Sequence, residues 1–169
     1  MSERVDPNST SDEITTLTQY LDYQRATILL KAEGLTREQL NQAHAPSTLT
    51  LGGLLKHLAL VEDSWIQVRF LGLPDIEPWA SAPFDADEDW DFHSAADDAP
   101  DQLRALYEAA CDRSRSAIVG IPLDQLAVVH RKAGEWTLRW VLLHLIEETA
   151  RHAGHADLLR EAIDGVVGE

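Results

Sequence analysis

The stretch TLRWVLLHLIEETARHAGHADLLREAI, residues 137–163, decides the fold. Its apolar residues recur three and four positions apart, which is the spacing of one face of an α-helix. Thr137 is a residue type favoured at helix starts, and Gly165 follows the last apolar residue as a stop signal. We therefore predict one long helix with a single buried face.

Three other stretches carry the same periodicity. They lie at about residues 12–33, at 51–71 behind Thr50, and at 101–117 behind Pro100. No run of alternating polar and apolar residues is strong enough to indicate a sheet. Four amphipathic helices of similar length bury their apolar faces most simply against one another, so we predict an all-α four-helix bundle.

The chain of 169 residues has the length of one ordinary domain. We place this single bundle domain at residues 11–165, between a disordered polar tail at 1–10 and a short tail at 166–169. A long acidic connection spans residues 72–97, and connections of this length usually have a function or are disordered. Its four large aromatic residues indicate packing against the bundle; they are Trp79, Phe84, Trp90 and Phe92.

Charge and composition restrict the function. With 14 Lys and Arg against 29 Asp and Glu, the net charge of −15 disfavours binding to nucleic acid or to an anionic membrane. No apolar run is long enough to span a membrane, and the polar amino terminus does not resemble a signal peptide. Cys111 is the only cysteine, so no internal disulfide forms. We expect a cytoplasmic protein.

The last helix contains four residues that could bind a metal ion: His144, Glu148, His152 and His155. A four-residue step on a helix rotates by roughly 40° and climbs about 6 Å, so one ion can be bound only by neighbours. Three pairs remain open: His144 with Glu148, Glu148 with His152, and His152 with His155. The second pair is the central one.

A third ligand must come from another helix, and His57 is the best candidate. It lies next to the buried face of the second helix, where an unpaired imidazole would be costly. Two imidazoles and one carboxylate suit zinc, and also nickel, manganese or iron(II), and they leave coordination positions open. The spacing alone equally allows His57 to bond a backbone carbonyl and Glu148 to form a surface ion pair with Arg151 or Arg139.

Two segments carry a family resemblance: GLLKHLALVEDSW at 53–65 and WTLRWVLLHLIEETARHAGHADLLRE at 136–161. Together with TLTQYLDYQRATILLKAEGLTREQL at 16–40, they resemble the DinB-like superfamily, in particular an uncharacterised branch that is widespread in actinobacteria. A more distant similarity is to the amino-terminal domain of mycothiol-dependent maleylpyruvate isomerase. The segment RHAGHADLLRE at 151–161 is the most specific part.

The resemblance implies a ligand set. Many DinB-like proteins use three histidines, two of them four residues apart on the last helix; here Glu148 and His152 occupy those positions and His57 lies on the second helix. The isomerase domain has the same His, Glu and His combination, with zinc as the metal. Family members of known activity use a low-molecular-weight thiol, mycothiol or bacillithiol, as cosubstrate, and the metal is thought to hold it as a thiolate.

These implications lead to a functional expectation. We expect a metal-dependent transferase that attaches such a thiol to a small electrophile, with Cys111 filling space rather than acting as nucleophile. The alternatives are a non-catalytic metal-binding or stress-response bundle and a metal-dependent hydrolase. The expected partner is a small-molecule substrate, and related proteins often pair through bundle faces, which favours a homodimer.

Overall fold

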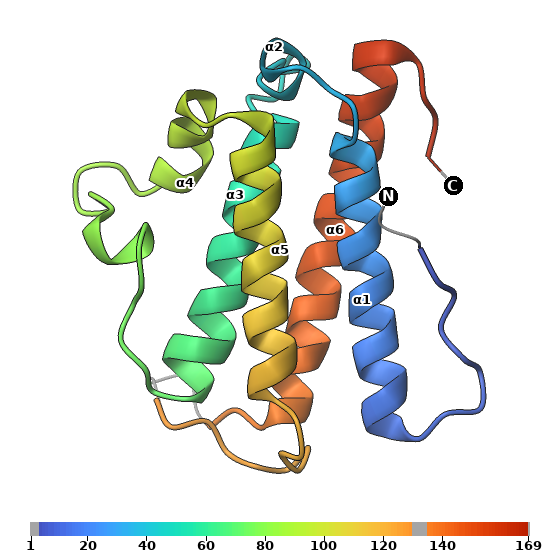
Figure 1. The fold of residues 1–169 in the computed structure, drawn as a ribbon, viewed down its shortest axis with the longest axis vertical. Helices are drawn as coiled ribbons and strands as arrows, with labels where there is room; N and C mark the ends of the chain where they lie inside the picture. The colour runs from blue at the N-terminus through green and yellow to red at the C-terminus, as the bar shows by residue number, and fades with distance from the viewer. Residues whose placement is uncertain (1–3, 130–134, 169) are drawn as a thin grey trace.

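Four long helices lie side by side in the computed structural model, which describes residues 4–129 and 135–168 (Figure 1). They are α1 (Glu13–Ala32), α3 (Leu51–Glu62), α5 (Pro100–Ala117) and α6 (Leu138–Asp164). The described residues form no β-strand, apart from one isolated bridge between Leu126 and Thr137. The prediction of an all-α bundle is confirmed.

The ends of these helices follow from local chemistry. The N-terminal caps of α1, α3 and α6 are Asp12, Thr50 and Thr137, and each accepts a hydrogen bond from the backbone N–H three residues later. These bonds satisfy donors that have no partner inside the helix. At the other end of α6, Gly165 adopts the left-handed conformation with φ of 79°, as expected of a glycine stop.

The second predicted helix has the expected extent but changes its hydrogen bonding. After Glu62, α3 continues as a π-helical segment, η1 (Asp63–Phe70), in which the Leu71 N–H donates to the Ile66 carbonyl at 3.0 Å. The wider turn begins at Asp63, which is 2% exposed and accepts hydrogen bonds from Arg113 and Trp79. A buried, fully paired carboxylate thus lies where the helix departs from α geometry.

The buried apolar residues form two clusters, one toward each end of the bundle. The first joins the end of α1, α3, α5 and the carboxyl-terminal half of α6, and the second joins the middle of α1, η1 and the start of α6. The buried face of α6 supplies both clusters and contains Leu138, Val141, Leu142, Leu145, Thr149, His152, Ala153, Ala156 and Leu159. His152 therefore lies in the apolar stripe itself.

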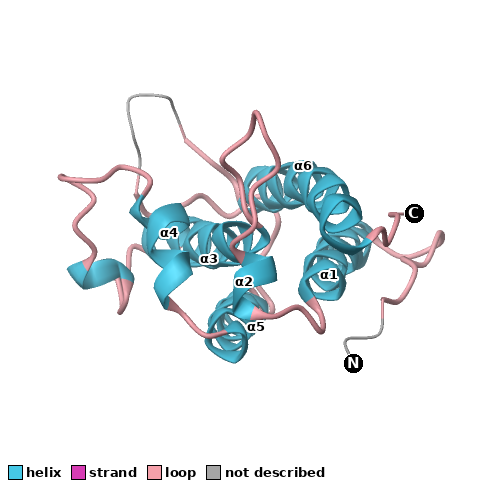
Figure 2. Ribbon diagram, turned by 90° about the horizontal axis from the view of Figure 1, so that it is seen from above, coloured by secondary structure: helices cyan, strands magenta, loops and turns pink. Residues whose placement is uncertain are grey.

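The connection at 72–97 is partly helical. It contains η2 (Trp79–Ser81), α4 (Trp90–His93) and η3 (Ser94–Asp97), and a further short helix, α2 (Arg37–Leu40), follows α1. Figure 2 shows α4 beside α3, on the outside of the bundle. Trp79 is 4% exposed and donates its indole N–H to the Asp63 carboxylate at 2.8 Å. The aromatic residues of the connection thus pack against the bundle.

The predicted tails fall partly outside the described residues, because 1–3 and 169 are not described. The disordered tail at 1–10 and the tail at 166–169 therefore stay predictions. Within the first of them, the Asn8 N–H donates to the Gln19 side chain at 2.8 Å. Among the described helices, none combines the length and the apolar character that a membrane span requires.

Candidate metal centre

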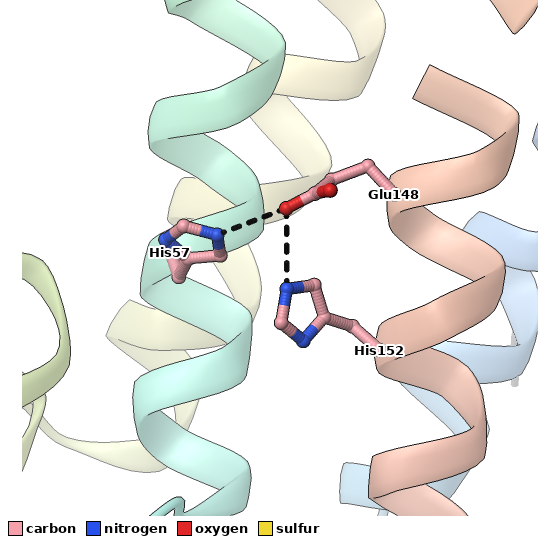
Figure 3. Close-up of side chains that lie close together, drawn as sticks. All are labelled: His57, Glu148 and His152. Atoms are coloured by element: carbon pink, nitrogen blue, oxygen red, sulfur yellow. Dashed lines mark hydrogen bonds and ion pairs between the residues drawn. The ribbon is translucent and has the colours of Figure 1, made fainter. Parts of the chain in front are cut away.

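His57 of α3 and Glu148 and His152 of α6 point toward one another across the interface between the two helices (Figure 3). The Glu148 Oε1 atom lies 3.5 Å from His57 Nε2 and 3.3 Å from His152 Nε2. All three potential ligand atoms lie within 4.8 Å of one another. The structure thus brings together the three residues that the sequence singled out, and metal binding by them stays a prediction.

The separations between these atoms suit a small divalent cation. Zinc–nitrogen and zinc–oxygen bonds of about 2.0–2.1 Å at tetrahedral angles place neighbouring ligand atoms roughly 3.3 Å apart. The two measured separations, 3.3 and 3.5 Å, are close to that edge length. Three protein ligands in a tetrahedral set leave one position for water or substrate, which is the arrangement of catalytic rather than structural zinc sites.

Each histidine has a partner on the side away from Glu148. His57 Nδ1 lies 2.7 Å from the Oδ2 atom of Asp91, a residue of α4 that is 3% exposed. His152 Nδ1 lies 3.3 Å from His155 Nδ1. Because a carboxylate accepts, the contact with Asp91 assigns the proton of His57 to Nδ1 and leaves its Nε2 lone pair directed at the central space. The contact of His152 Nδ1 with His155 leaves the Nε2 atom of His152 facing Glu148.

The charge balance of the site favours deprotonated ligands. Burial raises the pKa of Glu148, but the neighbouring His152 and His57 outweigh it and hold that pKa below its ordinary value. Burial, and secondly the nearby His57, lowers the pKa of His152. A carboxylate and a neutral imidazole are the forms that bind a metal ion, because a bound proton occupies the same lone pair.

A family model described as Mycothiol-S-transferase matches residues 16–165. The chain belongs to the mycothiol S-transferase family. Because this family is part of the DinB-like superfamily, the resemblance found in the sequence is confirmed. A comparison with curated proteins finds no match to the chain.

In this family member, the other two histidines of α6 flank the centre. His155 contacts His152 from one side. His144, one turn before Glu148, stacks on Trp140 with ring centroids 5.3 Å apart, and burial lowers the pKa of its imidazole. Of the three pairs that spacing left open, Glu148 with His152 is the one that His57 approaches.

The surface ion pairs considered for the acids of α6 involve a different glutamate. Arg151 pairs with Glu147, and Arg139 pairs with Glu13 of α1. Glu148 instead contacts the two imidazoles and is partly buried. The alternative interpretation thus holds for Glu147, whereas Glu148 faces the centre.

Cys111 takes no part in this centre. It lies on the buried face of α5 at 2% exposure, and burial raises the pKa of its thiol to about 12. A thiol in this state is almost entirely protonated at neutral pH and is a poor nucleophile. This member of the mycothiol S-transferase family therefore has no reactive cysteine thiol at the candidate metal centre.

Two residues at the centre were not predicted from the sequence. Asp91 bonds His57, and Phe92 stacks on the same imidazole with ring centroids 4.4 Å apart. Both belong to α4, in the connection that was recognised only as acidic and aromatic. Asp91 has several acidic neighbours, and no pattern in the sequence distinguishes it from them.

Proposed function

We propose that this chain is a zinc-dependent transferase that joins mycothiol, or a similar low-molecular-weight thiol, to a small electrophile. One observation carries the proposal in addition to family membership. Three potential ligand atoms from two helices converge within 4.8 Å, Glu148 Oε1 lies 3.5 and 3.3 Å from the two imidazole Nε2 atoms, and both histidines have an Nδ1 contact on the side away from Glu148. This is the arrangement of a preorganised, open metal site.

His57 Nε2, Glu148 Oε1 and His152 Nε2 would hold the ion. When bound there, a divalent cation supplies positive charge that lowers the proton affinity of an incoming thiol and favours the thiolate. Asp91 and Phe92 keep the His57 ring in one orientation, the former by a hydrogen bond and the latter by stacking. His155 does the same for His152 through its Nδ1 contact.

The transfer balances as a substitution. The thiol loses its proton to solvent, since the lowered pKa of Glu148 makes that carboxylate a poor proton acceptor at neutral pH. The thiolate sulfur attacks the electrophilic carbon, a sulfur–carbon bond forms, and the leaving group departs with its electron pair. The cosubstrate supplies the nucleophile, which agrees with the burial of Cys111.

Conjugation assays on protein purified without an affinity tag test this function. We expect conjugation of a model electrophile to require both mycothiol and a divalent metal ion. Replacing one ligand, as in His57→Ala, should reduce the rate by about tenfold or more. His93→Ala is the matched control, because His93 also pairs with an aspartate, Asp87, but is exposed and belongs to no part of the centre. Equal activity of both variants and wild type would refute the assignment.

A structural metal site is the second candidate, because the same three residues tie α3 to α6. In that case chelation would lower the melting temperature while no thiol conjugation is found at any metal loading. A metal-dependent hydrolase would use the same ligands with water as nucleophile and would act without thiol. Thiol dependence of product formation therefore separates the three functions in one assay.

A further inference from the structure

Four ring systems form an aromatic cluster beside the candidate metal centre: Trp65, Trp136, Trp140 and His144. Trp140 lies nearly parallel to His144, at an interplanar angle of 12°, and to Trp136, at 24°. Trp65 crosses the group from η1, with its ring centroid 4.4 Å from that of His144. The aromatic cluster thus bridges the same two helical segments as the metal centre, namely α3 with its continuation η1, and α6.

The aromatic cluster continues the line of contacts that makes the centre. His57 approaches Glu148, and eight residues further along the chain Trp65 contacts His144, which precedes Glu148 by one turn of α6. One turn of helix corresponds to roughly 5.4 Å. The edge of the aromatic cluster therefore lies about one turn from the proposed ligand atoms.

The aromatic cluster and the centre also open on the same side of the interface. On α6, Leu145 and Thr149 point into the core at 0% and 1% exposure, whereas His144 and Glu148 are only partly buried. Trp136 is 9% exposed and anchors the aromatic cluster, but Trp140 is 44% exposed. Trp140 thus gives the aromatic cluster a solvent-exposed ring on this side of the interface.

We propose that the aromatic cluster is the subsite for the body of the electrophile, and that it selects electrophiles with a flat, aromatic group next to the reacting carbon. This inference rests on the proposed function. Ring faces attract other ring faces through dispersion and offset stacking. The electrophile would then approach the ion from the side of His144, where the aromatic cluster lies one helical turn from Glu148.

Competing electrophiles test the selectivity. With 1-chloro-2,4-dinitrobenzene the thiolate sulfur displaces chloride from a ring carbon, and with iodoacetamide it displaces iodide from an aliphatic carbon. We expect Trp140→Ala to lower the ratio of kcat/KM for the aromatic over the aliphatic electrophile by about fivefold, whereas Trp140→Phe retains the ratio. Leu143→Ala is the matched control, because Leu143 is 50% exposed on the same helix and lies outside the aromatic cluster. An unchanged ratio in Trp140→Ala, or a raised KM for the thiol, would overturn the assignment.

Binding without chemistry separates this inference from the proposed function. We expect the unreactive compound 1,3-dinitrobenzene to bind the metal-free full-length protein in equilibrium dialysis, and Trp140→Ala to weaken binding by about fivefold. Equal binding by the variant and wild type would overturn the subsite, whatever the conjugation assays give. Weakened binding in the variant, in a protein that conjugates no thiol, would support the subsite and refute only the transferase.

Discussion

Asp91 Oδ2 lies 2.7 Å from His57 Nδ1, and this contact joins the acidic connection to the candidate metal centre. A carboxylate behind a metal-binding imidazole fixes its tautomer and orientation and raises its basicity. We therefore predict that Asp91→Asn weakens zinc binding by roughly 10–100-fold, while the fold persists. Competition with a chromogenic chelator measures the affinity, and circular dichroism checks the fold.

Asp87→Asn is the control for this prediction. Asp87 belongs to the same connection and also contacts a histidine, but that residue, His93, is largely exposed and lies outside the centre. Its replacement should leave zinc affinity unchanged. If both variants bind zinc as tightly as wild type, Asp91 does not support a metal ligand.

The imidazoles of α6 should make the metal-free protein less stable as the pH falls. Burial lowers the pKa of His152 and of His144 below the ordinary value of 6.5. The unfolded chain therefore takes up protons near pH 6.5 while the folded chain does not, so the free energy of unfolding decreases as the pH falls below that value. Urea unfolding in the presence of chelator, at about pH 7.5 and pH 5.5, measures this loss.

His152→Gln should reduce that pH dependence, because glutamine does not titrate in this range. His44→Gln serves as the control, since His44 is exposed and is not one of the residues of the centre. A loss of stability between the two pH values that is the same in both variants and in wild type would count against the assigned role of His152.

The long helices could be predicted from the sequence because each has a repeating pattern and a recognisable start. Thr50 and Thr137 cap the helices at the positions where the apolar repeat begins. The π-helical segment at 63–70 could not be predicted, because eight residues make only about two turns, which is too short a stretch to distinguish the repeat of an α-helix from that of a wider helix. Only the buried Asp63 and its partners mark the change.

The candidate site was predictable to the same degree. Spacing restricted α6 to neighbouring pairs, and His57 was found because it borders an apolar face. Asp91 was not found, since residues of an irregular connection have no period that relates them to a distant helix. The contact of Trp65 with His144 likewise depends on how the helix containing Trp65 is aligned with α6. The sequence alone does not give this alignment.

The ion pair between Arg25 and Glu62 should be essential to stability. Arg25 is 3% exposed and Glu62 is 1% exposed, and two hydrogen bonds of 2.7 and 2.6 Å join their side chains. Glu62→Gln would leave a buried positive charge with only Asp22 as an acidic partner, at a cost of about 3–5 kcal/mol in the free energy of unfolding. Urea denaturation of both proteins measures the difference.

Glu13→Gln is the matched control, because Glu13 also makes two hydrogen bonds to one arginine, Arg139, but at the surface. Exposed pairs of this kind contribute little, since water and salt screen them. A loss of stability in Glu13→Gln equal to that in Glu62→Gln would show that burial does not determine the strength of these pairs.

Gly72 should tolerate substitution less well than Gly120, although both have nearly the same backbone conformation, with φ of 72° and 74°. Alanine at either position pays about 1–2 kcal/mol for the left-handed conformation. At Gly72 a Cβ atom would also lie 2.6 Å from the Cγ1 atom of Val128, whereas at Gly120 nothing lies within 4 Å. The Val128 backbone is fixed by its hydrogen bond to the Phe70 carbonyl, so the clash adds about 1 kcal/mol or more to the cost in Gly72→Ala. Thermal unfolding of the two variants measures the difference in stability. Adding Val128→Ala to Gly72→Ala should bring the stability of the double variant close to that of Gly120→Ala. Equal melting temperatures of Gly72→Ala and Gly120→Ala would contradict this close packing.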